Sequence, residues 1–454
     1  MTTKNKVFGT DGIRCKANEF PMTAEVALAV GRAVAYVAKS GPHKHKIVIG
    51  KDTRVSGYIF ENAVVSGICS MGVDALLVGV IPTAGVAYLT KDLRADAGIM
   101  ITASHNSYED NGFKIFGRDG FKLSDEQEQD LEYFILGFRK FEGKDPVDEK
   151  VGKAYRIEDA RGRYIAHVKS VFPDELDLCG VKIGLDAANG AAYKIAPKIF
   201  EELGAEIRVL RGAEPNGTNI NDCCGALHTK HFSDDIKIDG CDIGISLDGD
   251  ADRLVLVDET GMVVNGDALL AIAAEDLIKT EGPQAIVATV MSNSALDEFV
   301  AGLGGSVVRA DVGDRYVIDE MRRGGHRFGG ENSGHIIYAK HGTTGDGLVA
   351  ALKVLAIMRK TGKKLSELSG LLKLYPQAIR NIDVKEKVEI KGLPELQDAI
   401  DEAYSQLNGT GRVLVRYSGT ENKLRIMVEC KVEEIAVAAA NKIEETARKV
   451  LGVV

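Results

Sequence analysis

The chain has 454 residues, 45% of them hydrophobic and 27% charged, which is typical of a globular protein with three or four domains. Its net charge of −9, with no Lys/Arg-rich block, argues against a general nucleic-acid binder. Its apolar runs are too short for the ~20 residues of a membrane span, and its seven cysteines without a C-x-x-C pair fit a reducing compartment, so we expect a cytoplasmic protein with no nucleic-acid or membrane partner.

The first predicted series is an apolar strand, a polar break, a helix and a second strand. The strand at 47–50 runs into Lys51-Asp-Thr-Arg54, and the helix at 58–70 leads to a strand at 75–80. This alternation is typical of a βαβ unit. Upstream, Phe8-Gly-Thr-Asp-Gly-Ile-Arg14 places an arginine after a Gly-rich turn, where it can supply positive charge.

A short apolar run at 99–101 predicts a buried strand that breaks abruptly at Thr102-Ala-Ser-His-Asn106. Loops at strand ends are where α/β folds place their chemistry. Ser104 has no long side chain to pack, so we expect it to donate hydrogen bonds or to carry a covalent group. His105 is adjacent, and Lys114 follows ten residues later as a second source of positive charge.

The second series runs through a strand at 181–185, a helix at 193–203 and a strand at 206–210. Farther on, two strands flank Asp248-Gly-Asp-Ala-Asp252-Arg253. Three carboxylates at alternate positions would repel one another unless a cation lies among them. Oxygen ligands in a tight loop suit Mg²⁺.

An EF-hand Ca²⁺ loop is the competing interpretation of this acidic segment. Asp248, Asp250 and Asp252 fit its first, third and fifth positions, and Glu259 falls at the twelfth. However, Arg253 stands at the sixth position, where the turn needs glycine, and the flanks are β-like. We therefore favour Mg²⁺, with a solvated acidic loop as the plain structural alternative.

The third series comprises 285–290, 295–303 and 306–309, and two polar loops follow it. Gly313-Asp-Arg315 opens a helix, and helix N-termini favour anions. Gly330-Glu-Asn-Ser-Gly-His335 offers a carboxylate, a hydroxyl and an imidazole, which can grip sugar hydroxyls or move a proton. Each loop taken alone is equally consistent with ordinary loop structure.

The last ~80 residues differ from these series. Two strands, 412–416 and 424–430, are joined by a polar loop, and a helix at 432–451 follows. Arg416-Tyr-Ser-Gly-Thr420 and Arg425 would present backbone N–H groups, hydroxyls and guanidinium groups together, a combination that suits a phosphate monoester. A hairpin loop with surface arginines explains the same residues equally well.

The expected fold class is therefore α/β, with three related mixed-sheet domains and a smaller C-terminal α+β domain. Polar stretches at 142–152, 258–261 and 371–377 set the expected boundaries. The predicted domains are 1–150 with the Ser104 loop, 151–257 with the acidic loop, 258–372 with the Glu331 loop, and 373–454 with the phosphate-binding loop.

Five motifs, in order, resemble those of the phosphohexomutase family: F-G-T-D-G-I-R, T-A-S-H-N, D-G-D-A-D-R, G-E-N-S-G-H and R-Y-S-G-T-E. The Gly330–His335 form is most similar to that of bacterial members that act on glucosamine phosphates. The resemblance implies four domains around a central cleft, and an intramolecular phosphotransferase that interconverts glucosamine 6-phosphate and glucosamine 1-phosphate. It also implies one Mg²⁺ per active site, and glucosamine 1,6-bisphosphate as intermediate and activator.

The same resemblance assigns roles to residues at matching positions. Ser104 would carry the phosphoryl group and, with Asp248, Asp250 and Asp252, ligate Mg²⁺. Arg14, His105 and Lys114 would surround the transferring group, with His335 or Lys114 moving a proton. The implied substrate-binding residues are Arg253, Gly313, Asp314, Arg315, Glu331, Asn332, Ser333, Arg416, Ser418, Gly419, Thr420 and Arg425.

Several alternatives stay open at this stage. A mutase acting on mannose or glucose phosphates would use the same chemistry. In a Mg²⁺-dependent phosphatase, water would intercept the phosphoserine, and a silent sugar-phosphate-binding protein would transfer nothing. The oligomeric state is also open, a homodimer included. Four residues depart from the usual family pattern: Cys15, Ser107, Ala251 and Asn422, where Gly, Pro, Gly and Pro are common.

Overall fold

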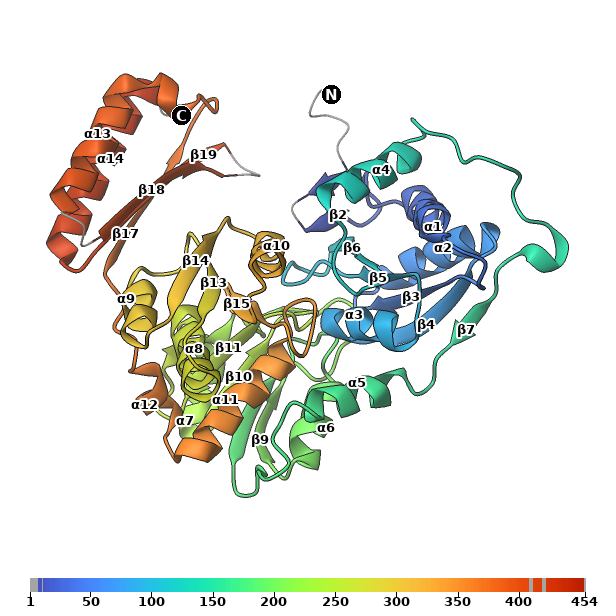
Figure 1. Ribbon diagram of the computed structural model, residues 1–454, viewed down its shortest axis with the longest axis horizontal. Coiled ribbons are helices and arrows are strands. Elements are labelled where there is room, and N and C mark those ends of the chain that lie inside the picture. The colour runs from blue at the N-terminus through green and yellow to red at the C-terminus, as the bar shows by residue number, and fades with distance from the viewer. Residues whose placement is uncertain (1–6, 10, 408–410, 419–421, 453–454) are drawn as a thin grey trace. The chain divides into compact units, whose positions relative to one another are not determined.

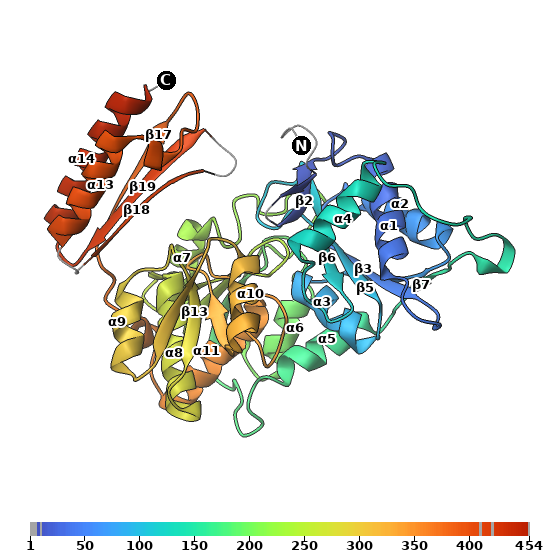
Figure 2. The same ribbon diagram turned by 45° about the horizontal axis from the view of Figure 1, so that its top comes forward.

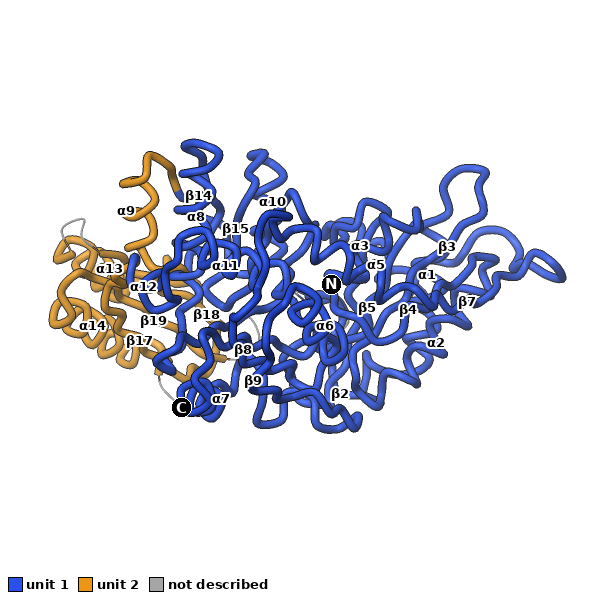
Figure 3. Tube along the Cα trace, turned by 90° about the horizontal axis from the view of Figure 1, so that it is seen from below, with its two compact units in different colours: residues 1–291, 307–371 blue, residues 292–306, 372–454 orange. Residues whose placement is uncertain are grey.

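The structure is a computed structural model that describes residues 7–9, 11–407, 411–418 and 422–452. The chain forms two compact units, one of residues 1–291 and 307–371 and the other of residues 292–306 and 372–454 (Figure 3). Within the described residues, no helix combines the length and the apolar character that crossing a membrane requires.

A seven-stranded mixed sheet begins the first unit, in the order β1-β2-β6-β5-β3-β4-β7 (Figure 1). Its strands are β1 (Phe8–Gly9), β2 (Gly12–Lys16), β3 (Lys46–Lys51), β4 (Asp74–Val80), β5 (Ala97–Ile101), β6 (Asp110–Gly117) and β7 (Ala154–Arg156). Its helices are α1 (Ala24–Ala38), α2 (Gly57–Ser70), α3 (Thr83–Asp92) and α4 (Asp125–Ile135), and a 3₁₀ turn spans Asp148–Lys150. Strand β3 is parallel to β4 and β5, and its residues 47–49 are fully buried, as expected for a strand covered on both faces.

The second and third sheets complete this unit, in the orders β12-β11-β10-β8-β9 and β14-β13-β15-β16. The second contains β8 (Lys182–Asp186), β9 (Glu206–Arg211), β10 (Ile243–Leu247), β11 (Leu254–Asp258) and β12 (Val263–Val264), and the third β13 (Ala285–Thr289), β14 (Ser306–Ala310), β15 (Phe328–Gly330) and β16 (Ile336–Tyr338). The remaining helices of the unit are α5 (Ala160–Lys169), α6 (Ile195–Glu202), α7 (Thr229–Ile238), α8 (Gly266–Glu281), α10 (Asp314–Gly324), α11 (Gly347–Thr361) and α12 (Leu365–Ser369). Parallel and antiparallel pairs occur in both sheets.

The second unit has an antiparallel sheet in the order β17-β19-β18, with two helices along one face (Figure 2). Its elements are β17 (Gln377–Asp383), α13 (Pro394–Leu407), β18 (Gly411–Tyr417), β19 (Lys423–Cys430) and α14 (Glu433–Leu451), and a 3₁₀ turn spans Ile390–Gly392. Helix α9 (Ala295–Gly302) also belongs to this unit, although it lies between β13 and β14 in the chain.

Side chains bind the α9 segment to the rest of the second unit. Ser294 donates to the fully buried Glu429 carboxylate from its backbone N–H, at 2.7 Å, and from its hydroxyl. Asn293 pairs with both backbone groups of Tyr375, each at 3.0 Å. The segment 292–306 therefore packs with chain that is synthesised much later.

The sheets confirm the predicted fold class of three mixed α/β layers and a smaller C-terminal α+β domain. The first two sheets extend past the boundaries expected at 150 and 257, because β7 pairs with β4 and β12 pairs with β11. The turn at 258–261 therefore joins two strands of one sheet. Strand β17 and helix α13 are additions that the sequence patterns did not predict.

Candidate active site

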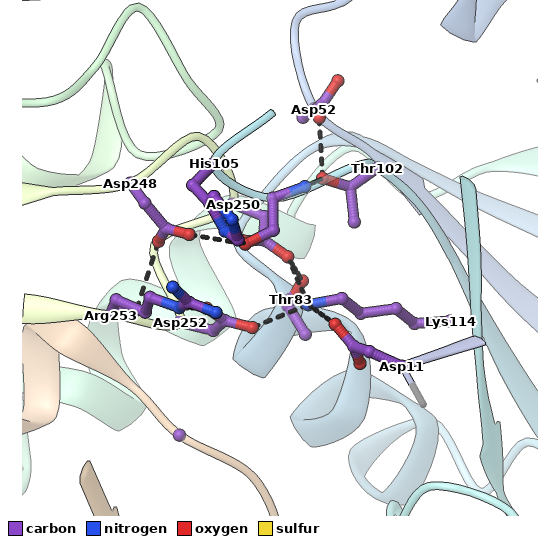
Figure 4. A network of polar contacts seen from close by, with 12 residues as sticks. Asp11, Asp52, Thr83, Thr102, His105, Lys114, Asp248, Asp250, Asp252 and Arg253 are labelled. Atoms are coloured by element: carbon purple, nitrogen blue, oxygen red, sulfur yellow. Dashed lines mark hydrogen bonds and ion pairs between the residues drawn. The ribbon is translucent and has the colours of Figure 1, made fainter. Parts of the chain in front are cut away.

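The Ser104 loop follows β5, as predicted, and its backbone is tightly constrained. Ser104 is 1% exposed and has a φ of 51°, which is unusual for a residue other than glycine. Its backbone N–H donates to the Thr102 hydroxyl at 2.9 Å, and its own hydroxyl donates to Asp248 at 2.6 Å. The loop thus directs the serine oxygen at the acidic loop of the second sheet. Figure 4 shows Thr102 and His105 of the Ser104 loop next to the aspartates of the acidic loop.

A buried arginine that was not among the predicted site residues holds the backbone of this loop. Arg54 donates to the carbonyl oxygens of Ser104 at 2.9 Å and Asn106 at 2.8 Å, and also to those of Ser107 and Asp110. Its Nε lies 2.9 Å from Asp52, and both side chains are fully buried. The sequence feature that could have indicated Arg54 as a site residue is the polar segment Lys51-Asp-Thr-Arg54, which directly follows a buried strand.

A second support comes from the loop before α7. The Asn221 amide donates to the same Ser104 and Asn106 carbonyls, each at 2.9 Å. Gly249 of the acidic loop also lies against this backbone, because a Cβ at that position would be 2.5 Å from the Ser104 carbonyl oxygen. The first and second sheets are therefore joined through the backbone of the Ser104 loop.

The three aspartates of the loop between β10 and β11 meet as expected. Asp248, Asp250 and Asp252 are almost completely buried, and they bring one carboxylate oxygen each within 4.8 Å of the others. One oxygen of Asp250 and one of Asp252 have no hydrogen-bond partner. Unpaired carboxylate oxygens are costly to bury. An all-oxygen set with unused lone pairs therefore fits Mg²⁺.

Lys114 forms ion pairs with this acidic cluster. Its ammonium is 2.8 Å from Asp250, 2.6 Å from Asp252 and 3.4 Å from Asp11. Although burial opposes it, the attraction of these carboxylates raises the pKa of Lys114 well above its usual value. Lys114 is therefore held as a cation, which favours charge neutralisation over proton acceptance.

The aspartates themselves respond differently to this surrounding charge. Burial and the repulsion of Asp252 and Asp250 raise the pKa of Asp248 well above its usual value. Burial also acts on Asp252, but the positive charge of Lys114 outweighs it and lowers the pKa of Asp252. Thr83 stabilises the cluster further, donating its hydroxyl to Asp250 at 2.5 Å.

Three other predicted residues, His105, Arg14 and Arg253, lie near the Ser104 loop and the acidic loop. The His105 Nδ1 is 3.4 Å from the Ser104 Oγ, and burial together with Arg253 and Arg14 lowers the pKa of His105 to about 4. Arg14 pairs with Asp11 at 2.9 Å and is partly exposed. The Arg253 Nε is buried without a hydrogen-bond partner. The Ser104 hydroxyl therefore has a neutral imidazole beside it, and the positive charges of Arg253 and Arg14 act on that imidazole.

The Glu331 loop follows β15 and presents polar groups at two depths. Asn332 and Ser333 are exposed, whereas Glu331 is mostly buried and accepts the Gly313 backbone N–H at 3.1 Å. Burial raises the pKa of Glu331, against the lowering effect of His335. The exposed pair is accessible to a ligand, and Glu331 connects this loop to the N-terminus of α10.

His335 is 2% exposed and lies behind the acidic cluster. Its Nε2 accepts the Gly345 backbone N–H at 3.0 Å, and its Nδ1 is 3.8 Å from Asp252. Although burial opposes it, Asp252, Asp314 and Glu331 raise the pKa of His335. The imidazole is therefore fixed by the Gly345 N–H, and its contact with Asp252 is a longer electrostatic one.

Asp314 and Arg315, at the start of α10, are both engaged by the first sheet and its helices. Asp314 binds Lys122, a largely buried lysine that also binds Asp11 and that sequence reasoning missed. The Arg315 guanidinium is 2.5 Å from Asp125 and 3.0 Å from Glu128 of α4. In this arrangement Arg315 joins two layers of the first unit.

In the second unit, Arg416 and Arg425 face each other across β18 and β19. Like charges directly opposite in a sheet repel, which favours an anion between them. Partial burial and the Arg425 charge lower the pKa of Arg416. Ser418 is buried at the end of β18, whereas the predicted ligands Gly419 and Thr420 lie outside the described residues.

The four departures from the family pattern have separate structural settings. Ala251 has a φ of 57°, a conformation that glycine adopts without strain. The Ser107 carbonyl is bound by Arg54, so the loop is held without proline. The Asn422 carbonyl accepts the Val384 N–H at 2.9 Å. Cys15 contacts the Phe20 carbonyl at 3.5 Å, and nothing in the structure explains its replacement of glycine.

Four family models match the chain in succession, all described as phosphoglucomutase/phosphomannomutase. They cover alpha/beta/alpha domain I at 5–137, domain II at 162–261, domain III at 265–375 and the C-terminal domain at 380–446. The acidic loop lies within domain II and the Ser104 loop within domain I. The matched ranges thus contain every element of the candidate site.

Curated relatives match over almost the full length. The chain is 52% identical over 454 residues to the phosphoglucosamine mutase of Citrifermentans bemidjiense, covering 98% of this chain and 99% of the relative. It is 53% identical over 449 residues to the phosphoglucosamine mutase of a Geobacter species, strain M21, covering 98% of each.

Solved structures agree in fold. A phosphoglucomutase/phosphomannomutase family protein from Burkholderia thailandensis has a TM-score of 0.82 at 23% identity, covering 99% of this chain and 98% of that one. The N-acetylphosphoglucosamine mutase of Aspergillus fumigatus, solved with GlcNAc-6P and magnesium, has a TM-score of 0.68 at 19% identity, covering 99% and 96%. The chain belongs to the phosphoglucomutase/phosphomannomutase family, the phosphohexomutases.

Proposed function

We propose that the chain is a phosphoglucosamine mutase that interconverts glucosamine 6-phosphate and glucosamine 1-phosphate through a phosphoserine at Ser104. The observation that carries this proposal is the 2.6 Å contact of the Ser104 hydroxyl with Asp248, inside an acidic cluster in which one oxygen of Asp250 and one of Asp252 have no hydrogen-bond partner. The relatives at 52–53% identity support the choice of sugar.

The reaction is a pair of phosphoryl transfers. In the first, the bond between the Ser104 Oγ and phosphorus breaks, and a bond from phosphorus to the free substrate hydroxyl forms, giving glucosamine 1,6-bisphosphate. After the sugar reorients, its other phosphoryl group returns to the Ser104 Oγ. Phosphoryl transfer depends on positioning and on neutralising charge. The Arg54 and Asn221 contacts supply the positioning by fixing the loop backbone.

Asp248, Asp250 and Asp252, with an oxygen of the Ser104 phosphate, would hold Mg²⁺. When bound, the ion supplies charge stabilisation for the transferring phosphoryl group. A phosphoserine adds about −1.5 to −2 charge at neutral pH. We assign Lys114, Arg14 and Arg253 to offsetting that charge.

The proton of the attacking hydroxyl needs an acceptor. Lys114 is held as an ammonium by three carboxylates, so it is poorly suited to this task. We propose His335 as the acceptor, which requires that its imidazole be neutral although nearby carboxylates raise its pKa, and that its Nε2 release the Gly345 N–H. Glu331, Asn332 and Ser333 are proposed to bind the sugar hydroxyls and amine, with Gly313, Asp314 and Arg315 at the neighbouring helix terminus.

The phosphate that is not being transferred needs its own site. The facing Arg416 and Arg425, with Ser418, Gly419 and Thr420, are proposed to bind it. Because the sugar must bind in two orientations, this site has to bind a phosphate group without discriminating between the two sugar carbons that can carry it. A pair of guanidinium groups meets that requirement, since both attract any phosphate monoester.

A specificity assay tests the choice of sugar. The measurement is kcat/KM for the 1-phosphates of glucosamine, mannose and glucose, each with Mg²⁺ and a catalytic amount of the matching 1,6-bisphosphate. We expect glucosamine 1-phosphate to be preferred by at least tenfold. A preference for mannose or glucose would keep the chemistry and overturn the substrate.

A variant at the phosphorylated residue tests the chemistry. Ser104→Ala should lose turnover and Mg²⁺-dependent incorporation of labelled phosphate, while Ser107→Ala, an exposed serine of the same loop, should keep both. Stoichiometric release of inorganic phosphate by the wild-type protein would instead favour a phosphatase. Absence of labelling in the wild type would favour a silent binding protein.

A further inference from the structure

A second group of metal-ligating side chains lies at the edge of the first sheet opposite to Ser104. Among the described residues, two groups bring three such ligand atoms within 4.8 Å of one another, and one is the aspartate cluster of the active site. The other is His43, His45 and Asp96. None of these three residues has a part in the proposed mutase reaction.

The three residues come together at the start of two neighbouring strands. His43 and His45 lie in the irregular segment that leads into β3, and both imidazoles face Asp96. Lys44, between them, points elsewhere and pairs with Asp74 at 2.7 Å. Asp96 immediately precedes β5, the parallel neighbour of β3, with Ile47 opposite Ala97. The residues before both strands are therefore side by side (Figure 1).

The carboxylate of Asp96 receives one imidazole on each oxygen. The His43 Nε2 is 2.7 Å from one oxygen, and the His45 Nδ1 is 3.3 Å from the other. The two rings are 4.3 Å apart between centroids. The Asp96 side chain is 3% exposed and also accepts the Lys46 backbone N–H at 3.1 Å, which fixes its orientation as an outer-shell hydrogen bond would.

We propose that His43, His45 and Asp96 bind one divalent ion of the zinc class. Two imidazole nitrogens and a carboxylate oxygen suit Zn²⁺ and neighbouring transition ions, whereas Mg²⁺ and Ca²⁺ prefer oxygen ligands alone. Ligands that share an ion tetrahedrally at ~2.0–2.2 Å lie about 3.3–3.6 Å apart. The His45–Asp96 separation of 3.3 Å already fits this spacing, and the hydrogen-bonded His43–Asp96 pair, at 2.7 Å, would open by less than about 1 Å to admit the ion. His43 is 42% exposed, so water can complete the coordination.

The position of this site indicates what the ion would do. Strands β3 and β5 have five or six residues each, so at ~3.3 Å per residue the site is on the order of 17–20 Å from the Ser104 loop. An ion there cannot take part in phosphoryl transfer. It would instead tie the segment 39–45 to the start of β5 and stabilise the folded chain by mass action.

Calorimetric titration of the full chain with Zn²⁺ tests the proposal, with Mg²⁺ at saturation to occupy the aspartate cluster. We expect one Zn²⁺ site, weakened at least tenfold in His43→Gln and in His45→Gln. His231→Gln, at an exposed histidine elsewhere, should bind as the wild type does. Mutase activity without Zn²⁺ should be the same in all four proteins. Equal Zn²⁺ affinity in the two site variants and the wild type would overturn the proposal.

X-ray absorption at the zinc edge gives an answer that needs no variant. The wild-type protein with one equivalent of Zn²⁺ should show two imidazole ligands and oxygen ligands. Sulfur scattering would place the ion at cysteines instead, with the adjacent Cys223 and Cys224 as the first candidates, and would equally overturn the proposal.

Discussion

Replacing Arg54 with lysine tests whether the Ser104 loop depends on a planar guanidinium. The wild-type side chain directs its five N–H donors at four loop carbonyls and Asp52. Lysine keeps the charge but has three donors that cannot form the same fork. Asn221 also donates hydrogen bonds to the carbonyls of Ser104 and Asn106. The carbonyls of Ser107 and Asp110 therefore lose the larger share of their hydrogen bonding in Arg54→Lys.

The loss can be estimated from these contacts. Two hydrogen bonds from a charged donor are worth about 1.5–3 kcal/mol each, so about 3–6 kcal/mol of local stabilisation disappears. A loop that loses this stabilisation no longer holds the Ser104 oxygen in position. Displacing a reacting atom by 1 Å lowers the rate about 10²-fold. We therefore expect Arg54→Lys to lower kcat about 100-fold with KM nearly unchanged.

The assay is steady-state turnover of glucosamine 1-phosphate with Mg²⁺, together with thermal unfolding. Arg163→Lys is the matched control, because Arg163 pairs only at the surface, with Asp159 and Asp92. Exposed pairs of this kind contribute about 0–1 kcal/mol. If Arg54→Lys kept kcat within about threefold of the wild type, the positioning argument would be wrong.

Three further outcomes follow from charges in the structure. Burial raises the pKa of Glu128 to about 7 against an ordinary 4.5. Between these two pH values the folded chain holds a proton on Glu128 that the unfolded chain releases, so the stability that Glu128 contributes falls as pH rises from about 4.5 to 7. The unfolding temperature should therefore fall less over this pH range in Glu128→Gln than in the wild type, and an equal fall in both proteins would contradict this. Mg²⁺ at 100 times its Kd should stabilise the wild type by about 2.7 kcal/mol and Asp250→Asn hardly at all, and a thermal shift that survives this change would remove Asp250 from the metal site. Arg425→Gln should raise KM about tenfold without lowering the unfolding temperature, because it removes a like-charge neighbour of Arg416; a destabilised variant with normal KM would refute an anion site there.

The sequence was most informative where the chemistry is contiguous in the chain. Ser104 and the three aspartates could be predicted because each group ends an apolar strand, and strand ends meet at one edge of a sheet. The helix at α4 could also be predicted, because Ser124 and Gln127 form both bonds of a capping box.

The supporting residues could not be found in the same way, because their roles exist only in three dimensions. Arg54 has a local signal, but nothing near it in the chain says that its partners are backbone carbonyls some 50 residues away. Arg315 looks like an anion ligand at a helix terminus, yet Glu128 pairs with it from 187 residues earlier. Such long-range ion pairs follow from the packing of whole layers.

The placement of residues 292–306 has a consequence for biosynthesis. Ser294 leaves the ribosome 135 residues before Glu429, and Asn293 precedes Tyr375 by 82. At a synthesis rate of about 5–20 residues per second, roughly 7–27 s pass between the synthesis of Ser294, at the start of helix α9, and that of Glu429, whose carboxylate accepts its hydrogen bonds. A nascent chain stalled near residue 372 therefore presents an unpaired helix, and we expect it to be an early target of chaperones and proteases.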